Sequence, residues 1–107
     1  LHYAAPPVIG GVESTIFHHA NKLSDLGIKV EIIAGRVEPF NNNVEFHRIP
    51  EVDTLNTRVQ GISKELAQGH ISPEFKALCD ILVDKLLPIL SNCDVCIVHN
   101  ALSLHFN

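Results

Sequence analysis

The sequence has few basic residues, few cysteines and no long apolar run. Lys and Arg number 8 against 12 Asp and Glu, a formal net charge of -4, so the basic surface that nucleic-acid binding requires is missing. The longest apolar stretch, residues 81–90, is broken by two charged residues and a proline, whereas a membrane helix needs ~20 nearly uninterrupted apolar residues. The 3 cysteines cannot all pair within one molecule, and the sequence opens without the pattern of a secretory signal. We therefore expect a cytoplasmic protein that binds no nucleic acid.

The length and the two ends of the chain bear on its domain organisation. The 107 residues, 46% of them hydrophobic, suit a single globular domain. The first residues read as the end of a strand that runs into a loop, and the last residues stop in the middle of a pattern. We expect residues 1–107 to form one domain that is incomplete at both ends.

Hydrophobic periodicity predicts alternating strands and helices. A helix is expected over 12–26, where apolar residues recur on one stripe and Gly27 supplies a left-handed cap. A second helix is expected after Ser72 and Pro73, with a wide apolar face. Further strands are expected at 28–34, ended by Gly35, and at 44–50 and 94–99.

Two segments are harder to interpret. Within 51–71, apolar residues at helical spacing indicate a short amphipathic helix, although Gly61 and Gly69 weaken the pattern. The residues after Asn100 suggest the start of another helix. The resulting order of elements predicts an α/β fold, a Rossmann-like parallel sheet with flanking helices.

Ligands of such a sheet bind outside the carboxyl ends of its strands. One candidate is the turn that contains Gly10 and Gly11, directly before the first helix. Adjacent glycines let the backbone approach a ligand, and a helix start offers unpaired N–H groups that favour phosphate or carboxylate. A glycine pair can equally be only a flexible turn, so the position before the helix is what favours the ligand.

Several well-known ligand and catalytic motifs are absent. The glycine turn is neither a dinucleotide fingerprint nor a Walker motif, and the strand ending at Ala34 lacks the acidic residue that holds an adenine ribose. No serine lies in a nucleophile elbow. Nicotinamide, P-loop and hydrolase-triad chemistry are therefore disfavoured.

The second candidate is His99 with Asn100, at the end of the last predicted strand. A strand that ends in histidine delivers an imidazole to the ligand crevice, where it can hydrogen-bond a hydroxyl or a reacting group. The same pattern also arises from a histidine that merely ends its strand.

The cysteines and paired histidines predict no metal site. Cys93 and Cys96 have the CxxC spacing but lack a second pair, and they lie where a buried strand begins, so we interpret them and Cys79 as packing residues. His18 and His19 are neighbours on a helix and point about 100° apart, so they cannot share a metal ion.

The glycine turn with its flanking prolines and Glu13, the helix after it and the strand at 28–33 resemble the opening of family 4 retaining glycosyltransferases of the GT-B fold. The run 94–99, Asp-Val-x-x-x-His, is similar to a second segment of that family. The resemblance covers residues 3–34 and 94–107, whereas residues 36–92 agree only in layout.

This resemblance implies the N-terminal, acceptor-side half of a two-domain enzyme. Such an enzyme transfers a sugar from a nucleotide sugar to an acceptor with retention, without a metal or other cofactor. His99 would lie against the transferring sugar, and Gly10, Gly11 and Asn100 would contact the donor diphosphate or the acceptor. The nucleotide would be held mainly by a C-terminal domain, so this chain alone should be inactive.

Two departures and two alternatives accompany the resemblance. Ile97 stands where many relatives have histidine, and Asn100 where many have an acidic residue, which leaves the acceptor contacts open. The main alternative is a flavodoxin-like or other small α/β binding domain without catalytic activity, and a purely structural α/β domain is another. A peripheral membrane contact at 51–71 stays open, because many relatives use lipid-linked acceptors.

Overall fold

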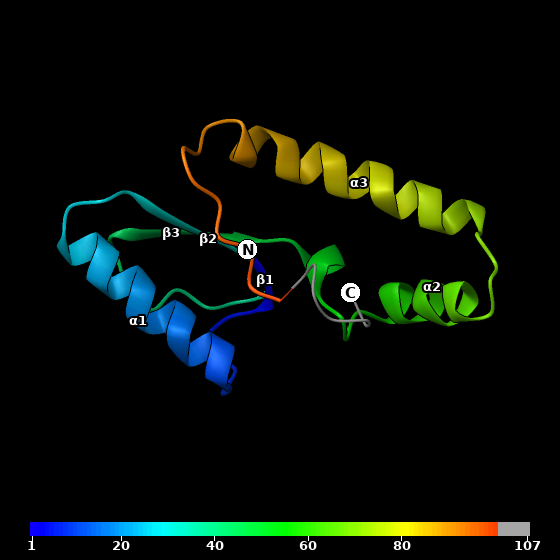
Figure 1. The fold of residues 1–107 in the computed structure, drawn as a ribbon, viewed down its shortest axis with the longest axis horizontal. Helices are drawn as coiled ribbons and strands as arrows, with labels where there is room; N and C mark the ends of the chain where they lie inside the picture. The colour runs from blue at the N-terminus through cyan, green and yellow to red at the C-terminus, as the bar shows by residue number, and fades with distance from the viewer. Residues whose placement is uncertain (101–107) are drawn as a thin grey trace.

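The computed structural model describes residues 1–100 and forms one parallel sheet with helices around it (Figure 1). The expected helix after Asn100 lies outside the described residues. The sheet has three strands in the order β1-β2-β3, which confirms an α/β fold with a parallel sheet. In chain order the elements are β1 (His2–Ala4), α1 (Gly11–Asp25), β2 (Val30–Arg36), β3 (Val44–Arg48), the 3₁₀ turn η1 (Pro50–Val52), α2 (Thr57–Ala67) and α3 (Pro73–Leu90).

The core lies between the sheet and α1. Side chains alternate between the two faces of a strand, and β2 turns Ile32 and Ala34 toward Ile16 and Ala20 of α1, with Val44 of β3 completing the cluster. α1 begins and ends within one residue of the predicted 12–26. Gly27 has φ +77°, so the predicted left-handed cap is confirmed.

The connection from β2 to β3 contains no helix. Parallel strands usually need a crossover of a dozen or more residues, but here residues 37–43 return directly across the core. Phe40 anchors this segment, because its ring lies 4.9 Å from that of Phe17 and 5.0 Å from that of Phe46. An Asn41 Nδ2 hydrogen bond to Asn21 Oδ1, 2.6 Å long, ties the crossover to α1.

The prediction that Gly35 ends its strand is wrong. β2 continues to Arg36, and Gly35 is buried within it. A Cβ at this position would overlap the backbone and Cβ of Asp53, just after η1. Gly35 therefore allows β2 and the chain at Asp53 to approach each other closely. The residues around Gly35 in the sequence do not reveal this role of a strand glycine.

The segment 51–71 contains a real helix, as its weak pattern indicated. Asn56 caps α2, its side-chain oxygen accepting hydrogen bonds from the backbone N–H groups of Arg58 and Val59. Ile62 is buried, and the chain leaves the helix through Gly69 in the left-handed region. Gly61 is tolerated because the cap and the buried apolar face offset its weak helix propensity.

α3 is the longest helix of the described residues, and Pro88 lies inside its last turn. Ser72 and Pro73 mark its start as predicted, although the Ser72 side chain makes no capping bond. Only Leu78 of its apolar face is buried, while Val83 and Leu87 are 57% and 60% exposed. Within residues 1–100, no helix is both long enough and apolar enough to cross a membrane.

The strand predicted at 94–99 does not form. Residues 94–99 are assigned no strand, and Val95 is 78% exposed. The segment still lies beside the first residue of the chain: Leu1 N donates to Ile97 O at 2.8 Å, and His99 N donates to Leu1 O at 3.0 Å. These two bonds follow the parallel pattern.

The cysteine prediction fails for the same reason. Cys93 and Cys96 are exposed free thiols rather than packing residues, because the segment that carries them is not covered on both faces. Cys79 is partly buried on α3, in keeping with its interpretation as a packing residue.

An ion pair at the η1 turn predicts a pH-dependent stability. Lys85 Nζ of α3 donates to Glu51 Oε1 at 2.6 Å, and this bond lowers the pKa of Glu51 from its usual value. A carboxyl whose pKa is lowered by folding stabilises the protein above its unfolded pKa and loses that contribution as the pH falls through its folded pKa. Lys85→Gln should therefore reduce stability at pH 7 by up to ~1 kcal/mol, since both partners are partly exposed.

The measurement is urea unfolding of Lys85→Gln and wild type between about pH 3 and 7. The difference should vanish at the acid end of that range. Lys76→Gln, a change of the same kind at an exposed position of α3, is the matched control. A pH-independent difference would show that Lys85 acts through packing of its stem.

Candidate functional site

The start of α1 brings Gly10 against the chain's own carboxylate. Gly10 is the residue before the helix, and a Cβ there would overlap the carboxylate of Glu13. Glu13 is 7% exposed and lies in the first turn, where the positive end of the helix dipole stabilises negative charge. Gly11 differs, because no atom lies within 4 Å of a Cβ built on it.

This arrangement bears on which ligand the helix start can take. The backbone N–H groups of the first turn have no partners within a helix, and the first bond inside α1 is from Ser14 N to Gly10 O at 3.0 Å. A diphosphate at this end would be repelled by the negative charge of Glu13. A hydroxyl group would not be repelled, because it can accept a hydrogen bond from an N–H and donate one to the carboxylate.

β1 places His2 between the two predicted sites. Its side chain is 1% exposed, and Nδ1 lies 2.7 Å from the main-chain oxygen of His99. A carbonyl oxygen only accepts, so Nδ1 carries the proton of this bond. The other ring nitrogen, Nε2, lies 3.8 Å from Glu13 Oε1, too far for a hydrogen bond, and is buried without a partner.

The imidazole of His99 lies among other histidines. Its ring centre is 6.3 Å from that of His2 and 6.5 Å from that of His19 on α1. Burial is the main cause that lowers the pKa of His99 from its usual value, and the neighbouring imidazoles of His2 and His19 act in the same direction. His99 is therefore neutral near pH 7, the state in which imidazole can accept a proton or a hydrogen bond.

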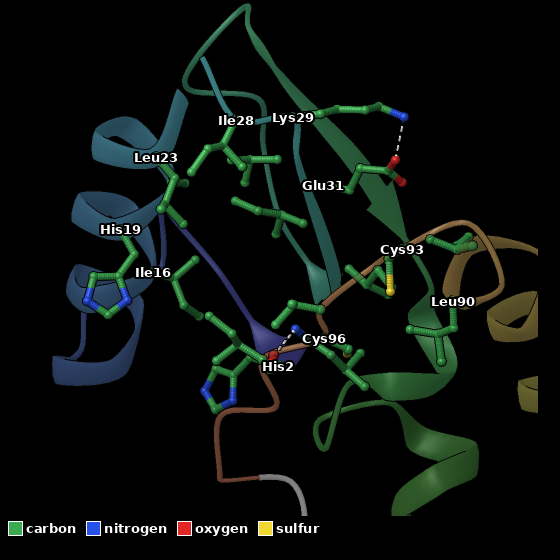
Figure 2. A pocket seen from close by; sticks show the side chains of 18 of the residues that line it. His2, Ile16, His19, Leu23, Ile28, Lys29, Glu31, Leu90, Cys93 and Cys96 are labelled. Atoms are coloured by element: carbon green, nitrogen blue, oxygen red, sulfur yellow. Dashed lines mark hydrogen bonds and ion pairs between the residues drawn. The ribbon is translucent and has the colours of Figure 1, made fainter. Parts of the chain in front are cut away.

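The histidines border an apolar cavity of about 480 Å³ (Figure 2). α1 contributes Ile16 and Leu23, β2 contributes Ile32, and the chain around Leu90 and Cys96 closes the opposite side. A cavity of this volume with few polar groups is typical of small-molecule sites. His2, His19 and His99 supply polar atoms to its lining.

The predicted site residues are connected only indirectly. A chain of contacts runs from Gly10 to Glu13, on to His2 and then to the main chain of His99. Asn100 has φ 58°, the left-handed region that asparagine adopts more readily than most residues, so it redirects the chain directly after His99.

Neither of the two residues that make this connection was predicted as a site residue, although Glu13 belongs to the glycine-turn motif and His2 lies beside the end of the first strand. Glu13 lies three positions after Gly10, the position from which a glutamate side chain reaches back to the start of its helix. That spacing could have identified Glu13. His2 could not be placed from the sequence, because its burial depends on the pairing of β1 with β2 and on contact with residues almost one hundred positions away.

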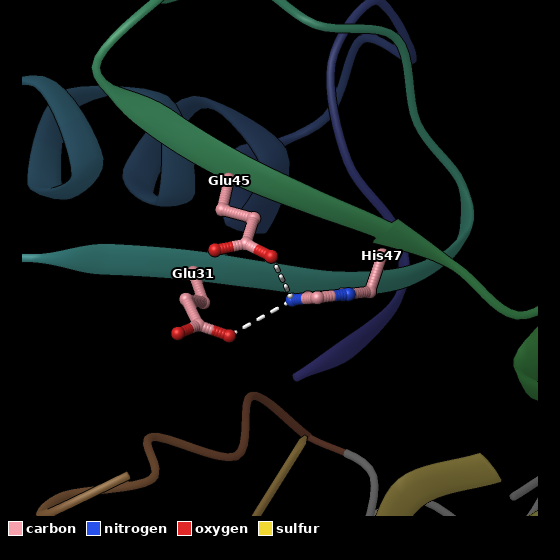
Figure 3. Close-up of side chains that lie close together, drawn as sticks. All are labelled: Glu31, Glu45 and His47. Carbon is pink, nitrogen blue, oxygen red and sulfur yellow. Dashed lines mark hydrogen bonds and ion pairs between the residues drawn. The ribbon is translucent and has the colours of Figure 1, made fainter. Parts of the chain in front are cut away.

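A second polar cluster lies on the sheet face turned away from α1. Glu31 of β2 with Glu45 and His47 of β3 form it (Figure 3), and Lys29 lies at its margin. The sequence alone does not indicate these residues as ligands, since only the register of β2 against β3 brings them together.

Comparison with known protein families, with curated proteins and with solved structures finds no match to this chain.

Proposed function

We propose that this chain is the acceptor-side, N-terminal domain of a retaining glycosyltransferase of family 4 with the GT-B fold. The whole enzyme would transfer a sugar from a nucleotide sugar to an acceptor without a metal cofactor, and the chain alone would be inactive. The observation that carries the proposal is the line of contacts that joins the Gly10 turn to His99 through Glu13 and His2.

The residues of the site suggest distinct roles. The neutral imidazole of His99 would hydrogen-bond a hydroxyl of the transferring sugar as positive character develops at its anomeric carbon. His2 would fix the main chain that carries His99. Glu13 beside Gly10 and Gly11 favours a hydroxyl over the donor diphosphate at the start of α1, so we assign this turn to the acceptor. Asn100 would contribute an amide to the same region.

A nucleotide sugar would need a further domain to complete its site. The described residues carry no cluster of basic side chains at the Gly10 turn, and such side chains are the usual partners of a diphosphate. The proposed partners are therefore a nucleotide sugar, an acceptor and a C-terminal domain of the same protein. If the acceptor is linked to a lipid, we propose that α2 also contacts the membrane. For other acceptors no membrane contact is proposed.

One observation favours the second candidate, a small α/β binding domain without catalytic activity. The cavity beside His99 is bordered mainly by apolar side chains, as expected for a site that holds an apolar molecule rather than a sugar.

A thermal-shift screen of UDP-, GDP- and ADP-sugars distinguishes the two candidates. The protein of the complete reading frame is compared with this 107-residue chain. A donor at about 100 times its dissociation constant stabilises the folded protein by ~2.7 kcal/mol, so one class of donor should raise the melting temperature of the longer protein and leave the chain alone unchanged. No shift in either protein, or a reading frame that ends near Asn107, would contradict the transferase.

A further inference from the structure

Two glutamates face each other on the side of the sheet turned away from α1. The register pairs Glu31 of β2 directly with Glu45 of β3, and His47 follows two residues later on the same face. Figure 3 shows the three side chains converging on one point above the strands. Like charges directly opposite each other destabilise a sheet, so this pair needs a cation beside it.

The spacing of the three side chains fits the ligand shell of a metal ion. His47 Nε2 lies 2.8 Å from Glu31 Oε2 and 3.5 Å from Glu45 Oε1. One ligand atom from each residue lies within 4.8 Å of the others. Metal–ligand bonds of ~2.0–2.2 Å place neighbouring ligand atoms ~3.0–3.6 Å apart in tetrahedral or octahedral shells, so only small side-chain shifts are needed.

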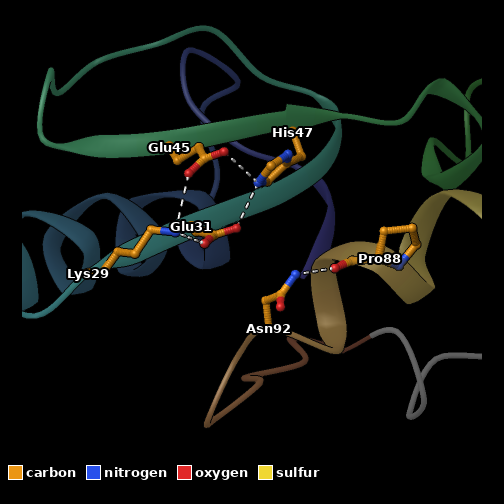
Figure 4. A network of polar contacts seen from close by, with 6 residues as sticks. All are labelled: Lys29, Glu31, Glu45, His47, Pro88 and Asn92. Carbon is orange, nitrogen blue, oxygen red and sulfur yellow. Dashed lines mark hydrogen bonds and ion pairs between the residues drawn. The ribbon is translucent and has the colours of Figure 1, made fainter.

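A lysine ammonium supplies the positive charge in the present arrangement. Lys29 Nζ lies 2.5 Å from Glu31 Oε1 and 3.5 Å from Glu45 Oε2 (Figure 4). The Lys29 side chain is 74% exposed, so it can move into solvent without losing packing.

We propose that Glu31, Glu45 and His47 bind a divalent transition-metal ion of the Zn²⁺ class, with water at the remaining positions. One imidazole nitrogen with two carboxylate oxygens suits Zn²⁺ and its neighbours, whereas Ca²⁺ and Mg²⁺ prefer oxygen ligands alone. The ion would displace Lys29 and tie β2 to β3.

The three ligands lie on the sheet face turned away from α1, whereas His2 pairs with Ala34 on the α1 side. Glu31 and Lys29 nevertheless line the cavity that His2 and His99 border, so the ion would lie at the margin of that cavity. Its binding can be tested on this chain without a donor or acceptor.

Calorimetric titration with ZnCl₂ near pH 7 tests the site. The wild-type chain should bind one equivalent, and His47→Gln and Glu45→Gln should each weaken that binding by about tenfold or more. His70→Gln is the matched control, because His70 is an exposed histidine outside the cluster, and it should bind Zn²⁺ as the wild type does. Circular dichroism checks that each variant is folded.

The variant Lys29→Gln distinguishes a metal site from an ion-pair network that binds no metal. Removing the competing ammonium should tighten Zn²⁺ binding if the three ligands accept the ion. The proposal is overturned if the wild type shows no saturable binding up to about 1 mM Zn²⁺, or if His47→Gln binds as tightly as the wild type. The proposal is also overturned if Lys29→Gln remains folded and fails to bind.

Discussion

Replacing His99 by alanine in the complete enzyme should lower turnover by about 100-fold or more, the range that general acid–base or electrostatic groups supply. The contacts that hold this segment pass through the main chain of His99: its N–H bonds Leu1, and its carbonyl accepts from His2. Alanine keeps both bonds and removes only the imidazole. The fold should survive, and the loss should appear in steady-state turnover.

His70→Ala serves as the matched control for this experiment. His70 is exposed after the end of α2, so its loss should leave turnover and melting temperature unchanged. Unchanged turnover in His99→Ala would show that the imidazole of His99 takes no part in the transfer. A loss of turnover matched by a loss of folded protein would show that the imidazole acts through stability.

Gly35→Ala should destabilise the chain by about 3 kcal/mol, a large effect for the addition of one methyl group. The new Cβ would overlap the main chain of Asp53 as well as its Cβ, and a backbone cannot move aside as a flexible side chain can. The Arg36 Nε–Asp53 Oδ2 ion pair, 2.8 Å long, holds the same two segments together. Relieving the overlap would therefore stretch that contact as well. Urea unfolding followed by circular dichroism measures the loss.

Gly61→Ala offers a control with the opposite expected sign. Gly61 lies inside α2, and a Cβ there would meet nothing within 4 Å. Alanine should stabilise this helix by ~0.5–1 kcal/mol, because it has fewer backbone conformations than glycine in the unfolded chain and so loses less conformational entropy on folding. Equal effects of the two substitutions would contradict the close approach of β2 to Asp53.

Segments with strong local signals were predictable from the sequence. α1 follows from its apolar stripe and from Gly27, and the start of α3 follows from Ser72 and Pro73, because each signal lies within a few residues of the element it defines. The parallel sheet follows from the order of the elements. Even the weak pattern around Ile62 marked a real helix.

Features that depend on distant parts of the chain were not predictable. Gly35 resembles a strand end until Asp53 lies against it, and the apolar run around Val95 resembles a buried strand although its faces are uncovered. Burial of His2 depends on pairing between remote segments. The placement of His99 beside a transferring sugar stays a prediction.

The stereochemistry of the product is the most direct test of the proposed transferase. The complete enzyme is supplied with the donor that stabilises it and with candidate sugar or lipid-linked acceptors, and the anomeric proton of the product is assigned by NMR. We expect a new glycosidic bond with the anomeric configuration of the donor, formed at least about 100-fold more slowly by His99→Ala. An inverted product, or no transfer from any donor that binds, would contradict the assignment of this domain to a retaining glycosyltransferase.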